Sequence, residues 1–116
     1  MDGKTELVTL SIAARDEVSR RMRRAMDGEP QGSHITFTSF EVLWKVISPK
    51  RLEILRAMAG QGPLAIREVA RRVGRDVKAV HGDVQALLDA GLLETGAEGV
   101  VFPYAGVHVD FTLRAA

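Results

Sequence analysis

The sequence predicts an α+β fold in which a strand–helix–strand extension precedes a domain of short helices and a β-hairpin. Three observations predict this arrangement. Apolar and polar residues alternate over residues 6–13 and 34–38, which is the period of a strand. The period becomes that of an amphipathic helix over residues 65–73 and 77–90. Two short apolar runs then flank the glycine-containing segment 96–99, which is typical of a hairpin.

Length and composition limit the alternatives. A chain of 116 residues holds one core, or one small domain with an appendage. The absence of cysteine excludes disulfides, thiolate metal sites and a cysteine nucleophile, and it fits a reducing compartment. No apolar run approaches the roughly 18 residues of a membrane span, and the first ten residues do not resemble a signal peptide. We therefore expect a soluble, cytoplasmic protein.

The N-terminal extension, residues 1–38, begins with the strand 6–13. A helix is expected over residues 15–26, because apolar residues recur every four positions there, at Ala14, Val18, Met22 and Met26. Residues 27–32 are rich in turn formers and predict a linker before the second strand, 34–38. We expect this extension, or the C-terminal strand, to build a dimer.

Two helices are expected next. The run 40–47 follows a predicted capping box, Thr38 with Glu41, and its tryptophan, Trp44, is expected in the core. Ser48 and Pro49 then predict the start of a helix over residues 49–59, which ends at a glycine. Its inward residues are expected to be Leu52, Ile54, Leu55 and Met58.

The helices 65–73 and 77–90 are separated by a tight turn. Gly74 is expected to end the first helix and Asp76 to cap the second. Their expected inward residues are Ile66, Val69, Ala70 and Val73 in the first, and Val77, Val80, Val84, Leu87 and Leu88 in the second. Short strands over 92–95 and 100–102 then form the hairpin, and 107–113 is a final strand.

This order of elements is the plan of a winged helix-turn-helix domain, which we place at residues 39–116. Charge supports a polyanionic partner, because residues 49–82 hold eight basic and three acidic residues, a balance of +5. The alternative on charge alone is a solvated helix surface, with the arginines solubilising the helix and pairing with Glu68. The candidate DNA-contacting residues are Lys50, Arg51, Arg67, Arg71, Arg72, Arg75, Lys78, His81 and Gln85.

The candidates have different expected roles. Lys78, His81 and Gln85 point outward from the predicted recognition helix, towards base edges or phosphates. Arg75 is placed for a phosphate at the start of that helix. The remaining basic residues are expected to contact the DNA backbone, and two of them, Arg71 and Arg72, also suit the C-terminal dipole of their helix.

The runs 48–57, 62–81 and 87–94 carry a resemblance to a known group. They are similar to predicted prokaryotic winged helix-turn-helix transcriptional regulators related in fold to the MarR group, some of which resemble antitoxins. The similarity covers residues 40–113 and is most specific over 67–81. Two residues depart from the pattern: Gly82 stands where such proteins commonly carry a basic residue, and Ala65 replaces a serine-type helix cap. Both departures imply weaker or relaxed DNA binding.

We therefore expect a sequence-specific DNA-binding repressor, acting on double-stranded DNA as a homodimer. The alternative is an antitoxin that neutralises a small toxin partner and regulates its own operon, which a co-purifying neighbouring gene product would distinguish. An enzyme is not expected, because no cluster of acids, histidines or nucleophiles supports catalysis. No cofactor and no metal are expected either, since no histidine and acid positions have ligand spacing.

Overall fold

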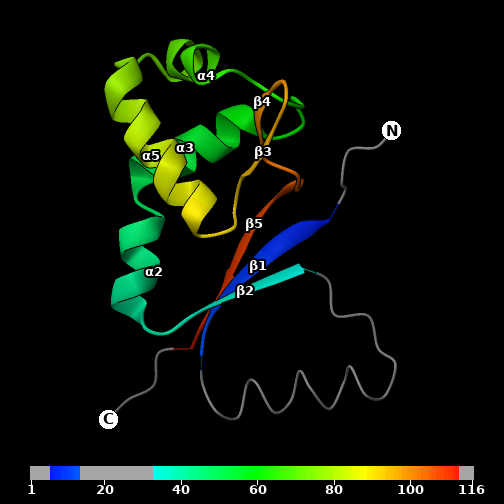
Figure 1. Cartoon of the computed structure of the whole chain (residues 1–116). Coiled ribbons are helices and arrows are strands. Elements are labelled where there is room, and N and C mark those ends of the chain that lie inside the picture. Colours follow the sequence, from blue (N-terminus) through cyan, green and yellow to red (C-terminus); the bar gives the residue numbers. More distant parts are fainter. Residues whose placement is uncertain (1–5, 14–32, 113–116) are drawn as a thin grey trace.

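A computed structural model of the chain describes residues 6–13 and 33–112 and has an α+β architecture (Figure 1). The predicted helix 15–26 and linker 27–32 lie outside these residues, as does the end of the predicted last strand. The elements, in chain order, are β1 (Leu7–Ile12), β2 (Ser33–Phe37), α2 (Phe40–Val46), α3 (Pro49–Met58), α4 (Ile66–Val73), α5 (Val77–Asp89), β3 (Glu94–Gly96), β4 (Gly99–Val101) and β5 (Gly106–Asp110).

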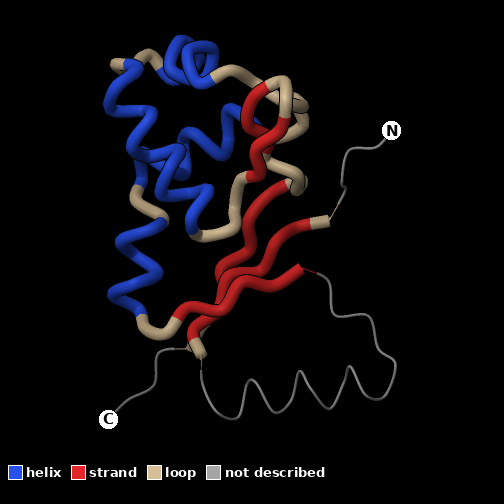
Figure 2. Tube along the Cα trace, in the orientation of Figure 1, coloured by secondary structure: helices blue, strands red, loops and turns tan. Residues whose placement is uncertain are grey.

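The larger sheet has the order β2-β1-β5, and both strand pairs are parallel. It takes two strands from the N-terminal extension and one from the C-terminal end, so it joins both sides of the predicted boundary at residue 38. Val8 and Leu10 in the central strand are completely buried. Figure 2 shows the helices gathered to one side of this sheet. One apolar cluster contains these strand residues together with buried residues of α2, α3, α4, α5 and the hairpin.

Helix ends follow the local sequence closely. Ser48 caps α3 by accepting a hydrogen bond from the backbone N–H of Arg51, and Asp76 caps α5 by accepting one from Ala79. Gly74 ends α4 in the left-handed conformation, φ +68°, which glycine adopts without strain. These three predictions are confirmed.

The small sheet is the antiparallel hairpin β3–β4, confirmed near its predicted place. Leu64, between α3 and α4, pairs with Val100 through two backbone hydrogen bonds of 2.8 Å. Gly99 allows this close approach, because a Cβ there would lie 2.4 Å from the carbonyl oxygen of Leu64. The hairpin is therefore fastened to the segment that leads into α4.

Several predictions about α2 and the helix faces are wrong. The N-cap of α2 is Ser39, not Thr38, and it accepts from the backbone N–H of Val42. Trp44 is 51% exposed, because Leu43 and Ile47 provide the buried face of this short helix. Leu52 and Val77 are 39% and 43% exposed, because each lies in the first turn of its helix, outside the packed interface.

Candidate functional site

The outward face of α5 presents a stripe of polar residues. Lys78, His81, Gly82 and Gln85 are all exposed and follow the i, i+3, i+4, i+7 spacing that places residues on one side of a helix. Val80, Val84 and Leu87 are buried on the opposite side. We call the residues Lys78, His81 and Gln85 the α5 stripe. Gln85 also donates a 3.0 Å hydrogen bond to Asp89 along the helix.

A groove of about 520 Å³ lies where α4 meets the start of α5. Its lining includes Arg67, Arg71 and Arg75, together with the exposed apolar side chain of Val77. Val77 was predicted to point inward and was therefore not predicted as a site residue. It is the first residue of α5, and helix periodicity alone does not indicate that such a terminal residue lies outside the packed interface.

The arginines of α4 are held by Glu68 on the same helix. Arg71 and Arg72 both donate to its carboxylate, at 2.5 Å and 2.7 Å. These hydrogen bonds lower the pKa of Glu68 to about 2, and the same contact raises the pKa of Arg71. The pairing with Glu68, raised as an alternative from the sequence, is therefore present. Arg71 nevertheless keeps 71% of its side chain exposed at the groove.

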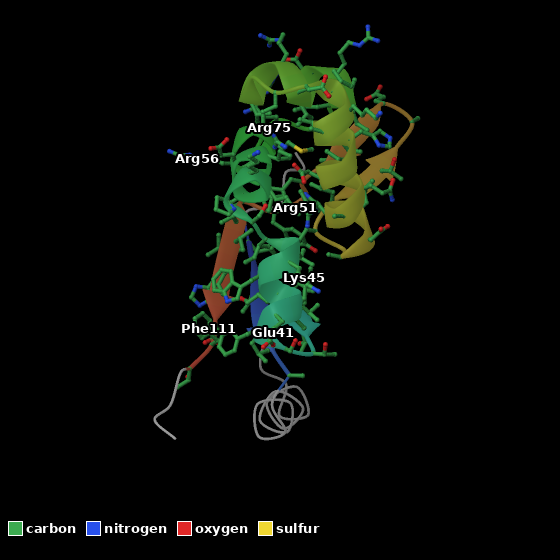
Figure 3. All side chains as sticks on the ribbon, turned by 90° about the vertical axis from the view of Figure 1, so that its left-hand side faces the viewer. Glu41, Lys45, Arg51, Arg56, Arg75 and Phe111 are labelled. Atoms are coloured by element: carbon green, nitrogen blue, oxygen red, sulfur yellow. The ribbon has the colours of Figure 1, made fainter. Side chains whose placement is uncertain are left out.

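A second ion-pair cluster joins α5 to α3 and to the turn before α5. The carboxylate of Asp83 accepts a 3.0 Å hydrogen bond from Nε of Arg51 on α3 and a 2.7 Å bond from Nη2 of Arg75 in the turn before α5 (Figure 3). We call Arg51, Asp83 and Arg75 the Asp83 cluster. Its three side chains are only 22%, 17% and 19% exposed.

The Asp83 cluster fixes the position of α5. Burial raises the pKa of Asp83, but the hydrogen bonds from Arg75 and Arg51 outweigh this effect and lower it below its ordinary value. Arg51 also donates to the carbonyl oxygens of Lys45 and Val46 at the end of α2. The cluster thus connects α2, α3, the turn and α5.

Arg51 and Arg75 were predicted to contact DNA, but in the structure both are paired with Asp83. Asp83 was not predicted as a site residue. The available signal was its spacing on the helix, three residues after Val80 and four before Leu87, because an acid on the buried face of a helix is usually paired.

Lys50 and Arg67 remain exposed, at the first turns of α3 and α4. Within the described ranges 6–13 and 33–112, neither they nor Lys78 forms an ion pair. In that same part of the chain, no group of three His, Asp or Glu side chains is arranged to hold a metal ion. None of its helices has the length and apolar character needed to cross a membrane.

The chain matches a known protein family. Residues 46–109, more than half of the sequence, match the HVO_A0114 family, and the chain belongs to that family. The matched region runs from the end of α2 into β5, so it contains the α5 stripe, the groove and the Asp83 cluster. No curated protein matches the chain.

Proposed function

We propose that residues 49–103 form a winged helix-turn-helix domain and that the protein is a sequence-specific, DNA-binding transcriptional regulator. In this proposal α5 is the recognition helix and the β3–β4 hairpin is the wing. The supporting geometry is the pair α4 and α5 joined across the left-handed Gly74, followed by a hairpin fastened to Leu64. As a regulator, the protein would act on double-stranded DNA as a two-fold dimer, which doubles the number of base pairs contacted.

The observation that carries the proposal is the α5 stripe. A recognition helix needs donors and acceptors near its N-terminus that no other part of the protein occupies. Among the residues that the structure describes, Lys78 and His81 meet this requirement, and both lie in the first two turns of α5. Gln85 lies one turn further along and would exchange its bond to Asp89 for a base contact.

Backbone contacts are assigned to the cations left without ion pairs. Arg67 lines the groove and Lys78 begins the α5 stripe, so we assign each of them to a phosphate of the DNA backbone. Lys50 is a further candidate at the start of α3. Arg51 and Arg75 support this surface from behind, through Asp83, and are not needed as DNA contacts.

Fluorescence anisotropy tests the proposal directly. The protein is titrated into duplex DNA from upstream of its own gene and into a scrambled duplex of equal composition, at about 50 and about 200 mM salt. We expect tighter binding to the native duplex and a steep loss of affinity with salt. Equal affinity for the two duplexes at both salt concentrations would refute a sequence-specific regulator.

Two variants assign the surface. Lys78→Ala should weaken binding and reduce the salt slope by about one. The matched control is Arg56→Ala, because Arg56 is an exposed arginine on α3 on the side of the molecule away from α5 (Figure 3). If both variants bind equally well, α5 is not the DNA-contacting helix.

A gain of function provides the complementary test. A Cβ at Gly82 would meet no atom within 4 Å, so α5 accommodates a side chain there. Gly82→Arg adds a cation in the middle of the exposed face and should tighten binding while steepening the salt slope by about one. Unchanged or weaker binding by this variant would contradict the assignment of this face to DNA.

A further inference from the structure

A cluster of three aromatic residues, two of them exposed and one partly buried, lies where α2 meets the segment that follows β5. Phe40 and Trp44 occupy successive turns of α2, and Phe111 follows β5. The ring of Phe111 meets Phe40 edge to face at 4.7 Å between centroids and Trp44 at 6.3 Å. We call these three residues the aromatic patch.

Residues outside the patch supply the buried face of α2. Leu43 and Ile47 are essentially completely buried and anchor the helix to the core. Trp44 and Phe111 are 51% and 42% exposed, and Trp44 is the single tryptophan of the sequence. Clustered exposed aromatic side chains are enriched at protein–protein interfaces, where their burial supplies much of the binding energy.

The charges beside the patch indicate which protein would cover it. Glu41 and Lys45 lie one helical turn apart on the outward side of α2, and both are exposed (Figure 3). Two copies of α2 packed antiparallel about a two-fold axis would place Glu41 against Lys45 of the partner subunit, and the reverse. The surface of α2 is therefore complementary to itself, with apolar rings flanked by one acid and one base.

We propose that the aromatic patch is the interface between two copies of this chain, with α2 packed against α2 of the partner subunit. Glu41 and Lys45 carry opposite charges, so together they give α2 no net attraction for DNA. This helix also lies at the opposite end of the helical layer from α4 and the first turn of α5 (Figure 1). Dimerisation here leaves the α5 stripe accessible, and it does not depend on the proposed DNA binding.

Sedimentation equilibrium of the full chain without DNA tests this interface. The wild type should show a monomer–dimer equilibrium between about 1 and about 100 µM. Trp44→Glu should raise the dimer dissociation constant at least about 30-fold, the effect of losing an interface hot spot. Leu52→Glu is the matched control, because Leu52 is an exposed apolar residue on α3 outside the patch, and it should leave the constant unchanged.

Charge reversal supplies a second test that keeps the aromatic residues intact. Glu41→Lys or Lys45→Glu alone places like charges across the two-fold axis and should raise the dissociation constant about two- to fivefold. The double reversal restores opposite charges and should return the constant towards the wild-type value. This pattern distinguishes antiparallel α2 pairing from a general loss of stability.

Three results would overturn the proposal. The first is a wild-type protein that stays monomeric throughout, as it would if the rest of its own chain or a different protein covered the patch. The second is a dimer that neither Trp44→Glu nor the single charge reversals weaken. The third is equal weakening by Leu52→Glu. If circular dichroism shows that Trp44→Glu does not fold, the charge reversals decide, and the anisotropy assay judges DNA binding separately.

Discussion

Replacing Asp83 by asparagine should destabilise the protein strongly, although the residue lies on a helix of the candidate DNA-binding surface. The carboxylate of Asp83 accepts two hydrogen bonds from two arginines on different elements. Asparagine keeps the shape of the side chain but loses its charge, and its amide nitrogen would face a guanidinium group. Both arginines would then remain largely buried without their counter-ion.

The magnitude follows from the burial of the cluster. A hydrogen bond to a charged group contributes about 1.5–3 kcal/mol, and removing one partner of a fully buried ion pair costs about 3–5 kcal/mol. Exposed pairs contribute at most about 1 kcal/mol. The side chains here are 17–22% exposed, which is close to the buried case but retains some solvent screening. We therefore expect Asp83→Asn to lower the free energy of unfolding by about 2–4 kcal/mol.

Urea denaturation followed by circular dichroism measures this change. Asp89→Asn is the matched control, because Asp89 is an exposed acid on the same helix that accepts a hydrogen bond from the nearby Gln85. Its effect should stay within about 0.5 kcal/mol. Should Asp83→Asn fall within the same range as the control, the Asp83 cluster does not position α5.

The same assay separates two roles for Arg75. If this residue serves mainly to hold Asp83, Arg75→Met should lower the free energy of unfolding, with a double-mutant cycle showing coupling to Asp83. If it serves mainly as a phosphate contact, Arg75→Met should weaken DNA binding and leave stability unchanged. The 2.7 Å bond to Asp83 favours the first outcome.

Two further predictions concern the hairpin and the response to acid. Gly99→Ala should lower the free energy of unfolding by at least about 1–3 kcal/mol, because its Cβ would clash with the carbonyl of Leu64 at a φ of +132°. Gly96→Ala is the control and should be nearly neutral, because a Cβ there meets no atom within 4 Å. Equal melting temperatures of the two variants would contradict this prediction. The folded-state pKa values of Asp83 and Glu68 lie below their ordinary values of 3.8 and 4.5. The stability that these two carboxylates contribute is therefore complete above the ordinary pKa values, and it is lost as the pH falls through the folded-state pKa values. Unfolding free energy should therefore decline below about pH 4.5, and less so in Asp83→Asn; identical profiles for the two proteins would refute this contribution.

Local features of the fold could be predicted because each depends on a few neighbouring residues. Ser48, Gly74 and Asp76 end or begin their helices as expected, since capping needs only a side chain or a backbone conformation within three residues. The outward placement of Lys78, His81 and Gln85 follows from helix periodicity in the same way. The α5 stripe was therefore accessible from the sequence.

Features that depend on distant residues were not accessible. Trp44 lies outside the core because α2 presents Leu43 and Ile47 to it, and hydrophobicity alone does not distinguish the two sides of a short apolar helix. The pairing of β5 with β1 joins segments at opposite ends of the chain, which no local pattern specifies.

The sequence by itself determined the order of the described helices and strands, the caps at Ser48, Gly74 and Asp76, and the polar face of α5, because these depend on local propensity and periodicity. The tertiary structure alone decided which charges from distant parts of the sequence are paired with one another. Arg51 and Asp83 are 32 positions apart, yet packing of α3 against α5 brings them within hydrogen-bond distance and withdraws Arg51 and Arg75 from the surface. A charged side chain can contact a partner molecule readily only if the fold does not already pair it with an opposite charge.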